Sequence, residues 1–236
     1  MSKARAVKNY LDTLALFEDE LYLPTVAAPA AAPSVAATSR SLRVLTGAVQ
    51  PLPASLAEFE TQICDCTKCA LGHSRTKFVY GDGDPQARIV FVGEAPGHDE
   101  DMSGIPFIGR AGQLLNEMLA AVGLDRKQVY ICNTLKCRPP NNRDPLPEEK
   151  AECRPYLRTQ LSLISPEIIV CLGKHAANEL LGSDDAMKNL RGRVIPWEGM
   201  RLLVTYHPAY YLRNMSQKVY GDEDFKLLRK LYDELN

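Results

Sequence analysis

The sequence has no long hydrophobic run. Among its 236 residues, no apolar stretch approaches the roughly 20 residues that a membrane-spanning helix requires. The N-terminus carries charges and lacks the continuous apolar core of a secretory signal, so we expect the chain to stay in the cytoplasm. Net charge is also nearly absent, at −1, and the overall charge therefore indicates no polyanionic partner. A binding surface can still be basic where acidic residues elsewhere compensate.

Two signatures of nucleotide-binding proteins are missing as well. No G-x-G-x-x-G follows the strand predicted near residue 90, and the chain contains no P-loop. The seven cysteines are an odd number in a chain without a secretory signal, which argues against a disulfide framework. Ligation of a metal or cluster is the better interpretation for some of them.

The length suits one α/β domain preceded by a tail. We assign residues 1–54 to the tail. Within it, apolar residues at helical spacing over 3–22 predict a helix, which either docks loosely or binds a partner. Residues 24–41 are rich in Ala, Pro and Ser and have too little bulky apolar surface to offset the entropy of ordering. Residues 55–236 should form the folded domain.

Apolar runs rich in β-branched residues alternate with amphipathic patterns. The runs predict strands at 87–93, 128–134, 167–172 and 201–206, with a shorter strand at 77–80. The amphipathic patterns predict helices at 55–64, 113–122, 147–164, 175–181 and 222–235. Such alternation indicates a three-layer α/β/α sandwich with a small, mainly parallel central sheet.

The first of these strands leads into a Gly/Pro-containing loop that is dense in ionisable residues. The loop carries Glu94, His98, Asp99, Glu100 and Asp101. Open α/β sheets place their chemistry at the carboxyl ends of strands. A carboxylate there can stabilise a developing cation or orient a water, with helix capping and solvated charge as the alternative. Glu94 is the first candidate and Glu100 the second.

Two other strand ends carry polar residues. Asn133 ends the second strand with an amide that both donates and accepts hydrogen bonds, although a turn could also require it. His207 follows the last strand and could donate to a developing oxyanion, although a lone histidine is more often structural. Phe107 could stack on a flat ligand or belong to the core. Because parallel strand ends converge, we expect Glu94, Asn133 and His207 to meet.

Four cysteines form two separated pairs. Cys66 and Cys69 make a C-x2-C motif, and Cys137 and Cys153 flank a Pro/Asn-rich loop. Four such thiolates suit either a tetrahedral zinc site or an iron–sulfur cluster, and the spacing does not choose between them. Cys64 is an alternative to Cys66 as a ligand. The two cysteines within predicted strands, Cys132 and Cys171, should belong to the core.

Basic residues are spread unevenly. Between Arg126 and Arg158, eight Lys/Arg face four acidic residues, which gives a local charge of +4. Further on, Tyr211, Leu212 and Arg213 combine aromatic, apolar and basic character. Such segments suit phosphate contact and insertion into base stacks, while a solvated helix surface is the competing interpretation.

In this order and spacing, the motifs resemble the family 4 uracil-DNA glycosylases, the iron–sulfur branch of the uracil-DNA glycosylase superfamily. The resemblance runs from about Thr61 to Leu235. It is carried by Cys66–Cys69, Gly93–Gly97 with Glu100–Asp101, Pro106–Gly109, Asn133–Pro140, Cys153 and His207–Ala209. It implies the sandwich fold described above and hydrolysis of the N-glycosidic bond of deoxyuridine in DNA. Residues 1–60 lie outside it.

The resemblance also implies site residues and a cofactor. Phe107 would stack on uracil, Asn133 would bind its polar edge, and His207 would bond a uracil carbonyl. Backbone around Glu94 and Ala95 would contact the ring. A [4Fe–4S] cluster would be held by Cys66, Cys69, Cys137 and Cys153.

The expected partner is uracil-containing DNA, single- or double-stranded, bound by a nucleoid-associated monomer. Leu212 or a neighbouring tyrosine such as Tyr211 would fill the emptied base stack, and Arg213 would hold a phosphate. Because Ala95 stands in the first motif and no basic insertion follows Cys137, we expect no covalent DNA product. A non-catalytic DNA-binding module is the alternative.

Overall fold

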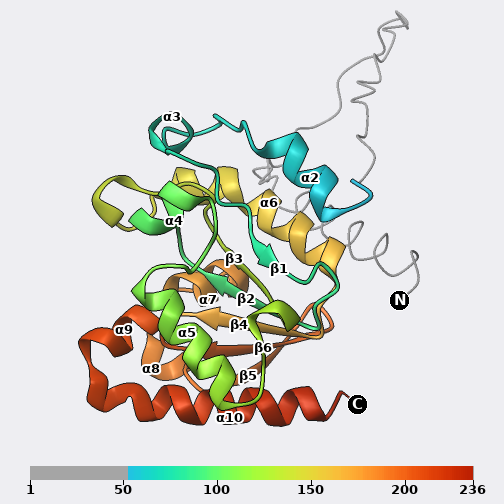
Figure 1. Cartoon of the computed structure of the whole chain (residues 1–236), viewed down its shortest axis with the longest axis vertical. Helices are drawn as coiled ribbons and strands as arrows, with labels where there is room; N and C mark the ends of the chain where they lie inside the picture. Colours follow the sequence, from blue (N-terminus) through green and yellow to red (C-terminus); the bar gives the residue numbers. More distant parts are fainter. Residues whose placement is uncertain (1–52, 236) are drawn as a thin grey trace, which may run out of the picture. The chain divides into compact units, whose positions relative to one another are not determined.

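The computed structural model describes residues 53–235, and these residues form a six-stranded sheet between two layers of helices (Figure 1). The predicted helix over 3–22 and the predicted linker over 24–41 lie outside the described residues. In the described part of the chain, no helix is long and apolar enough to cross a membrane.

The central strands of the sheet are parallel and its two edge strands are antiparallel. The strands are β1 (Asp82–Gly83), β2 (Ile89–Gly93), β3 (Tyr130–Asn133), β4 (Ile168–Leu172), β5 (Val194–Trp197) and β6 (Met200–Thr205). Their order across the sheet is β1-β3-β2-β4-β6-β5. Strands β3, β2, β4 and β6 run parallel, whereas β1 and β5 pair antiparallel with β3 and β6. The predicted three-layer sandwich with a mainly parallel sheet is confirmed.

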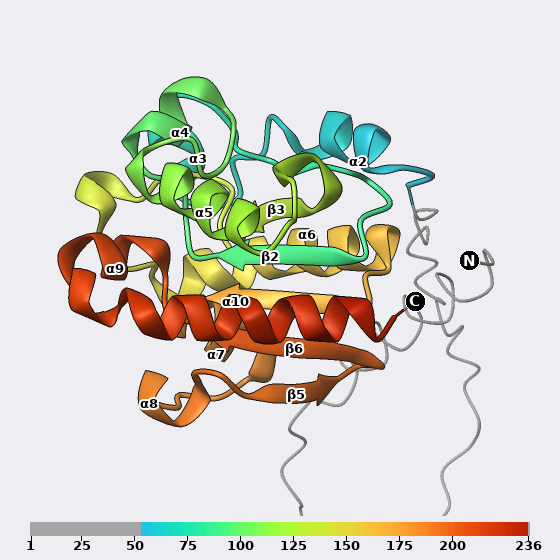
Figure 2. The ribbon, with the colours of Figure 1, turned by 60° about the horizontal axis from the view of Figure 1, so that its bottom comes forward.

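Helices cover both faces of this sheet. The α-helices are α2 (Leu56–Ile63), α3 (Leu71–Ser74), α4 (His98–Ser103), α5 (Arg110–Ala121), α6 (Pro147–Ile164), α7 (Lys174–Leu181), α8 (Met187–Leu190), α9 (Pro208–Arg213) and α10 (Lys218–Asp233). Single 3₁₀ turns occur at Arg126–Gln128, Pro140–Asn142 and Met215–Gln217. Residues of α2, α6 and α7 share one buried cluster with the sheet, and residues of α5, α9 and α10 share the other. Figure 2 shows α10 lying along the strands.

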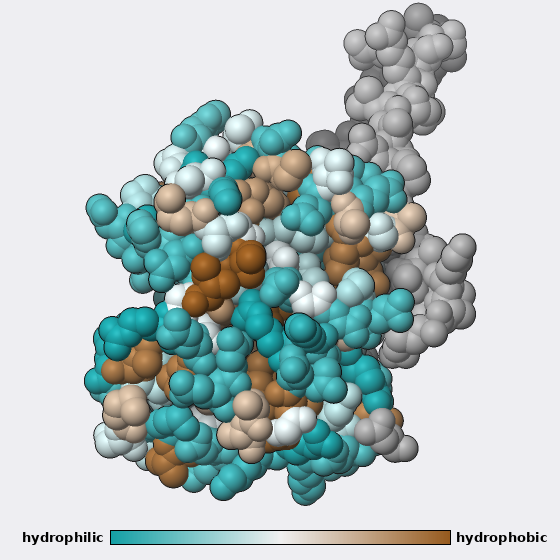
Figure 3. All heavy atoms as spheres, in the orientation of Figure 1, coloured by the Kyte–Doolittle hydropathy of each residue, from teal (hydrophilic) through white to brown (hydrophobic). Residues whose placement is uncertain are grey.

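The residues of β2 and β4 are apolar and buried throughout because both faces of the sheet are covered at its centre. In β2, Ile89 and Phe91 join the cluster under α5 and α10, while Val90 and Val92 join the cluster under α6. By contrast, the surface seen in Figure 3 shows apolar side chains only in small groups among hydrophilic ones. The register between β2 and β3 aligns the ends of these two strands, since Gly93 is paired with Asn133. The residues that follow these strands therefore emerge at one edge of the sheet.

Several sequence-based boundaries need correction. The strand predicted at 77–80 is wrong, because that segment is not part of the sheet and the adjacent strand is Asp82–Gly83. The edge strand β5 was not predicted, since it is short, partly exposed and contains Pro196. Helix α4 occupies part of the acidic segment that was expected to be a loop. Helices α5 and α10 begin at Arg110 and Lys218, earlier than predicted.

Candidate active site

The polar residues predicted at three strand ends meet around one cavity. Glu94 follows β2, Asn133 ends β3, and His207 follows β6 as the N-cap of α9. All three line a cavity of about 410 Å³, together with Ala95 and Phe107. The cavity is large enough for a single aromatic ring with part of a sugar, and its walls offer both flat apolar surface and hydrogen-bonding groups.

Asn133 presents an unsatisfied acceptor at this cavity. The residue is 1% exposed, and its Oδ1 has no hydrogen-bond partner within the protein. A buried polar atom without a partner typically costs about 1–3 kcal/mol, so its retention indicates a donor supplied from outside the chain. Gly93 permits this arrangement, because a Cβ there would lie 2.4 Å from Asn133 Oδ1 and 2.7 Å from the Phe107 ring.

His207 has a defined hydrogen-bonding direction. Its Nδ1 accepts a hydrogen bond from the Ala209 backbone N–H at 3.1 Å, so the neutral ring carries its proton on Nε2. Burial and, to a smaller extent, the charge of Arg213 together lower the pKa of His207 to about 4. The neutral imidazole is therefore a hydrogen-bond donor across the neutral pH range.

The ring of Phe107 lies beside His207, with 5.4 Å between ring centroids and 34° between planes. Its backbone adopts φ = 52°, a left-handed conformation that is unusual for an aromatic residue. The Arg126 guanidinium holds it in place by donating to the carbonyls of Pro106 at 2.6 Å and Phe107 at 3.0 Å. Strain maintained by dedicated contacts is typical of a residue positioned for function.

Glu100 contributes to this positioning. One oxygen accepts hydrogen bonds from the backbone N–H groups of Ile108 and Gly109, both at 3.0 Å, and the other accepts from Gly97 at 3.1 Å. The expected catalytic role of Glu100 stays a prediction, and the contacts of both its oxygens with the backbone indicate a structural role. It joins the turn before α4 to the turn that carries Phe107.

Glu94 combines a fixed backbone with a partly shielded carboxylate. Its carbonyl accepts from Thr134 Oγ1 at 2.6 Å and from the Leu135 N–H at 2.9 Å, which locks the end of β2 to the end of β3. Burial raises the pKa of Glu94, the nearby His175 lowers it and the carboxylate of Asp144 raises it. The carboxylate faces the cavity, where it can accept a hydrogen bond from a water.

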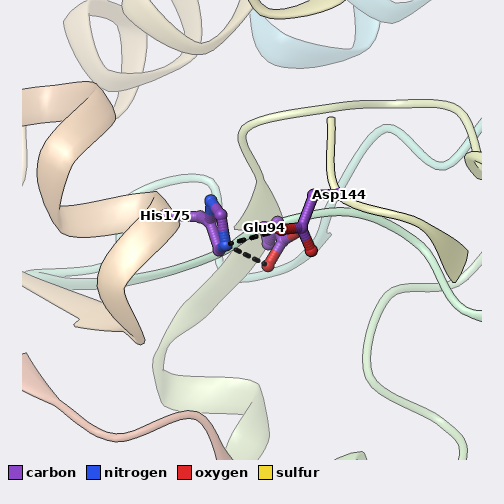
Figure 4. Close-up of side chains that lie close together, drawn as sticks. All are labelled: Glu94, Asp144 and His175. Atoms are coloured by element: carbon purple, nitrogen blue, oxygen red, sulfur yellow. Dashed lines mark ion pairs between the residues drawn. The ribbon is translucent and has the colours of Figure 1, made fainter. Parts of the chain in front are cut away.

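Sequence reasoning missed His175 and Asp144. The Nε2 atom of His175 lies 3.9 Å from Glu94 Oε2 and 3.8 Å from Asp144 Oδ2 (Figure 4). His175 follows the end of β4, so the rule that identified Glu94, Asn133 and His207 would also have found it. Asp144 lies in the loop before α6, where the sequence pattern gives no indication of its neighbours.

The segment expected to contact DNA is only partly available. Tyr211 is 0% exposed, and its hydroxyl lies 3.2 Å from Thr205 Oγ1 in the core. The expected DNA contact of Tyr211 stays a prediction, although its ring has no exposed surface in this structure. Leu212 is half-buried, and Arg213 is exposed and lines the cavity.

The four predicted ligand cysteines gather on one side of the sheet. Cys137 and Cys153 are buried in the α6-side cluster, and Cys66 and Cys69 pack against it. Two donors point at the sulfurs, with Arg75 Nη1 3.5 Å from Cys137 Sγ and the Tyr156 hydroxyl 3.2 Å from Cys66 Sγ. Cys132 and Cys171 are buried in β3 and β4, as predicted, and Cys64 Sγ lies 3.6 Å from the Thr61 carbonyl.

The distances among these sulfur atoms indicate whether they fit a single metal ion or a larger metal cluster. Zn–S bonds of about 2.3 Å place the sulfurs of a tetrahedral site roughly 3.8 Å apart. Among the described residues, the metal-type donors that converge within 4.8 Å are those of Glu94, Asp144 and His175 rather than the cysteines. The cysteine set therefore fits a larger group with several metal atoms better than a single zinc ion.

Comparisons with known proteins agree with this geometry. Residues 80–236 match the model of the uracil DNA glycosylase superfamily. The chain is 45% identical over 185 residues to the type-4 uracil-DNA glycosylase of Archaeoglobus fulgidus, which covers 75% of this chain and 93% of that protein. The type-4 enzyme of Thermotoga maritima is 48% identical over 156 residues, covering 65% of this chain and 81% of that protein. That of Sulfurisphaera tokodaii is 43% identical over 186 residues, covering 75% and 84%.

A strand-end cavity of this kind, on a mainly parallel α/β/α sandwich, is the site of an enzyme or binding protein for a small planar ligand. The chain belongs to the uracil DNA glycosylase superfamily and, within it, to the type-4 branch. The resemblance drawn from the sequence motifs is confirmed.

Proposed function

We propose that this protein hydrolyses the N-glycosidic bond of deoxyuridine in DNA, releasing uracil and leaving an abasic site, as the first step of base excision repair. The observation that carries the proposal is the unpaired Oδ1 of Asn133 at the cavity. The N3–H group of uracil is the donor that this acceptor lacks. The family relationship to enzymes named type-4 uracil-DNA glycosylases supports the same reaction.

Each wall of the cavity matches one part of the base. Phe107 stacks on the ring, Asn133 accepts from N3–H and donates to O4, and His207 donates from Nε2 to O2. Backbone at Glu94 and Ala95 contacts the ring edge. A base in duplex DNA reaches such a cavity only by flipping out of the stack, whereas a single strand presents it directly.

In the reaction, the bond between C1′ and N1 of uracil breaks and its electron pair stays with the base. His207 stabilises the resulting negative charge at O2 through the Nε2–H donor. Glu94 faces the cationic sugar and orients a water, whose oxygen bonds to C1′. One proton of that water passes to Glu94 and on to solvent, and the uracil anion takes up a proton after release. Each such electrostatic contact is typically worth about 3–4 kcal/mol of barrier.

In this proposal the thiolates of Cys66, Cys69, Cys137 and Cys153 would hold a [4Fe–4S] cluster. Their ligation would link three chain segments, and the excision would need no redox step. Cys137 and Cys153 flank the loop that brings Asn142, Arg143 and Asp144 to the cavity. Their ligation would therefore order one wall of the site.

Arg213 is the proposed phosphate contact, and Leu212 is the proposed filler of the emptied base stack. Both lie in α9, directly after the cavity residues His207 and Ala209. A DNA substrate supports the expectation of a cytoplasmic, nucleoid-associated protein, and the monomeric state stays a prediction. A partner for residues 1–54 stays a prediction, as does a separate fold for residues 55–236.

The test is uracil excision from a labelled oligonucleotide. Purified brown protein, with its cluster confirmed by visible absorbance, should create an alkali-sensitive site at uracil and leave a thymine control intact. Release of free uracil, measured in parallel, identifies the reaction as hydrolysis of the glycosidic bond. Tight binding to uracil-DNA without any base release would instead establish the non-catalytic binding module.

A further inference from the structure

The carboxylate of Glu94 belongs to a group of three ionisable side chains from three segments. Helix α7 supplies His175, the end of β2 supplies Glu94, and the loop before α6 supplies Asp144 (Figure 4). Their donor atoms all lie within 4.8 Å of one another. His175 is not itself among the residues that line the cavity, so any effect on the reaction passes through its neighbours.

The backbone before His175 is held firmly. Gly173 adopts φ = 98°, and its N–H donates to the Thr205 carbonyl at 2.8 Å. A Cβ on Gly173 would lie 3.2 Å from the Cβ of His207, so the turn passes close to the catalytic histidine. This turn fixes the start of α7 and places His175, its second residue, next to Glu94.

The side chains of His175 and Glu94 are partly shielded from solvent. The side chains of His175 and Glu94 are 34% and 28% exposed, whereas that of Asp144 is 82% exposed. Charges that are partly withdrawn from water interact more strongly than charges on an open surface. The Glu94–His175 contact therefore matters more than its 3.9 Å separation would suggest for two exposed groups.

We propose that His175 is a positioning residue for uracil excision, which attracts the carboxylates of Glu94 and Asp144 from the start of α7 and holds Glu94 at the cavity wall. The inference rests on the proposed function. It assigns a role to two residues, His175 and Asp144, that contact neither the base nor the sugar in the reaction described above.

The charges around Glu94 oppose one another. The pKa of Glu94 is raised by burial, lowered by His175, raised by Asp144 and lowered by Lys150 of α6. Loss of the His175 charge should therefore make Glu94 harder to ionise, and loss of the Asp144 charge should make it easier. Removing His175 and removing Asp144 should therefore shift the pKa of Glu94 in opposite directions, although both residues contact Glu94 or its neighbour in the same cluster.

Two of the other charged groups nearby, Lys174 and Arg143, are already paired with acidic residues. Lys174 Nζ lies 2.9 Å from Asp184 Oδ1, beside the start of α7. Arg143, on the cavity wall, donates to both oxygens of Glu149 at 2.6 and 2.9 Å. Arg213 also lines the cavity, and its charge acts on His207. The charges of these groups are the same in the wild type and in the variants described below.

The experiment compares the pH dependence of single-turnover uracil release from a single-stranded oligonucleotide for the wild type, His175→Gln and Asp144→Asn. The acid limb of the rate should move to higher pH in His175→Gln and to lower pH in Asp144→Asn, each by about 0.5–1 pH unit. His175→Lys restores a positive charge and should return the acid limb towards that of the wild type. Both target positions are partly or largely exposed, so the variants should fold.

His98→Gln serves as the matched control, because His98 also lies beside a carboxylate, with Nδ1 3.3 Å from Asp99 Oδ1, but does not line the cavity. Its profile should equal that of the wild type. Acid limbs that coincide in the wild type, His175→Gln and Asp144→Asn would overturn the inference and leave the proposed function intact. So would shifts of the same sign in both variants. A wild type that releases no uracil at any pH would instead overturn the proposed function.

Discussion

His207 illustrates how one side chain is prepared for its role by its surroundings. Burial brings its pKa to about 4, against an ordinary value of 6.5. Between these two pH values the unfolded chain takes up a proton that the folded protein refuses, so the free energy of unfolding falls as the pH is lowered through this window. Above it the ring is neutral in both states and no such cost arises. The site therefore maintains a neutral donor at physiological pH.

Replacing His207 by Ala should reduce the single-turnover rate of uracil release by about 10²–10³-fold, because the donor to the developing anion is lost. The dissociation constant for uracil-DNA should change by only a few-fold, since stacking on Phe107 and the bonds to Asn133 remain. Rapid-quench kinetics and fluorescence anisotropy measure the two quantities. Rate and affinity that fall by equal factors would show that His207 has a structural role instead.

At the scale of the elements, α4 and the turns on either side of it hold the ring of Phe107 in position. Glu100 connects the N–H of Gly97 to those of Ile108 and Gly109, one and two residues beyond the strained Phe107. A single carboxylate thus fixes two turns that lie on either side of the helix. A neutral amide of the same size has only one acceptor oxygen, so it cannot accept hydrogen bonds from both turns as the carboxylate does.

For this reason Glu100→Gln should lower the free energy of unfolding by about 1–3 kcal/mol, since at least one backbone N–H loses its acceptor. The KM for uracil-DNA should rise because Phe107 is less firmly held. Urea denaturation and steady-state kinetics test the two effects. Glu117→Gln, on the exposed side of α5, is the matched control and should change neither. An unchanged KM and stability in Glu100→Gln would contradict the structural role.

The sequence predicted those elements whose residues have a strong periodic pattern. Strands β2, β3, β4 and β6 are continuous apolar runs, and the rule that parallel strand ends converge placed Glu94, Asn133 and His207 together. Helix α4 was missed because His98–Ser103 contains little apolar surface and is held by Glu100 through distant backbone groups. Strand β5 was missed because tertiary pairing with β6, rather than its own sequence, determines it.

Individual side chains were harder to place than elements. Tyr211 was expected to contact DNA because its segment combines aromatic, apolar and basic residues, yet the core beneath α9 buries it completely. Asp144 and His175 come from segments with no shared sequence pattern, and only the folded chain brings them to Glu94. For Tyr211 and Asp144 the deciding contacts are long-range and local patterns carry no record of them, whereas the position of His175 after β4 could have indicated it.

At the scale of the whole molecule, α2 ties the start of the described chain to the domain. Its buried residues Leu56, Phe59 and Ile63 face the cluster under α6, and the Phe59 ring contacts Tyr80 and Tyr156 edge-on, at 6.1 Å in each pair. Ser55 caps the helix, with its side chain accepting from the Glu58 N–H at 3.1 Å. The packing of the domain therefore includes the chain from Ser55 onwards.

A chain that begins at Pro53 should accordingly keep its melting temperature, its brown colour and an excision rate within about two-fold of the full-length protein. The expectation follows because the cavity residues run from Glu94 to Arg213 and the first helix retains its cap. Adding Ser55→Ala to the shortened chain should cost about 1 kcal/mol of stability, which shows that the measurement detects the loss of one cap. A shortened protein with unchanged melting temperature and colour but a greatly reduced rate on DNA would assign residues 1–52 a part in substrate binding. That outcome would contradict a catalytic unit contained within residues 53–236.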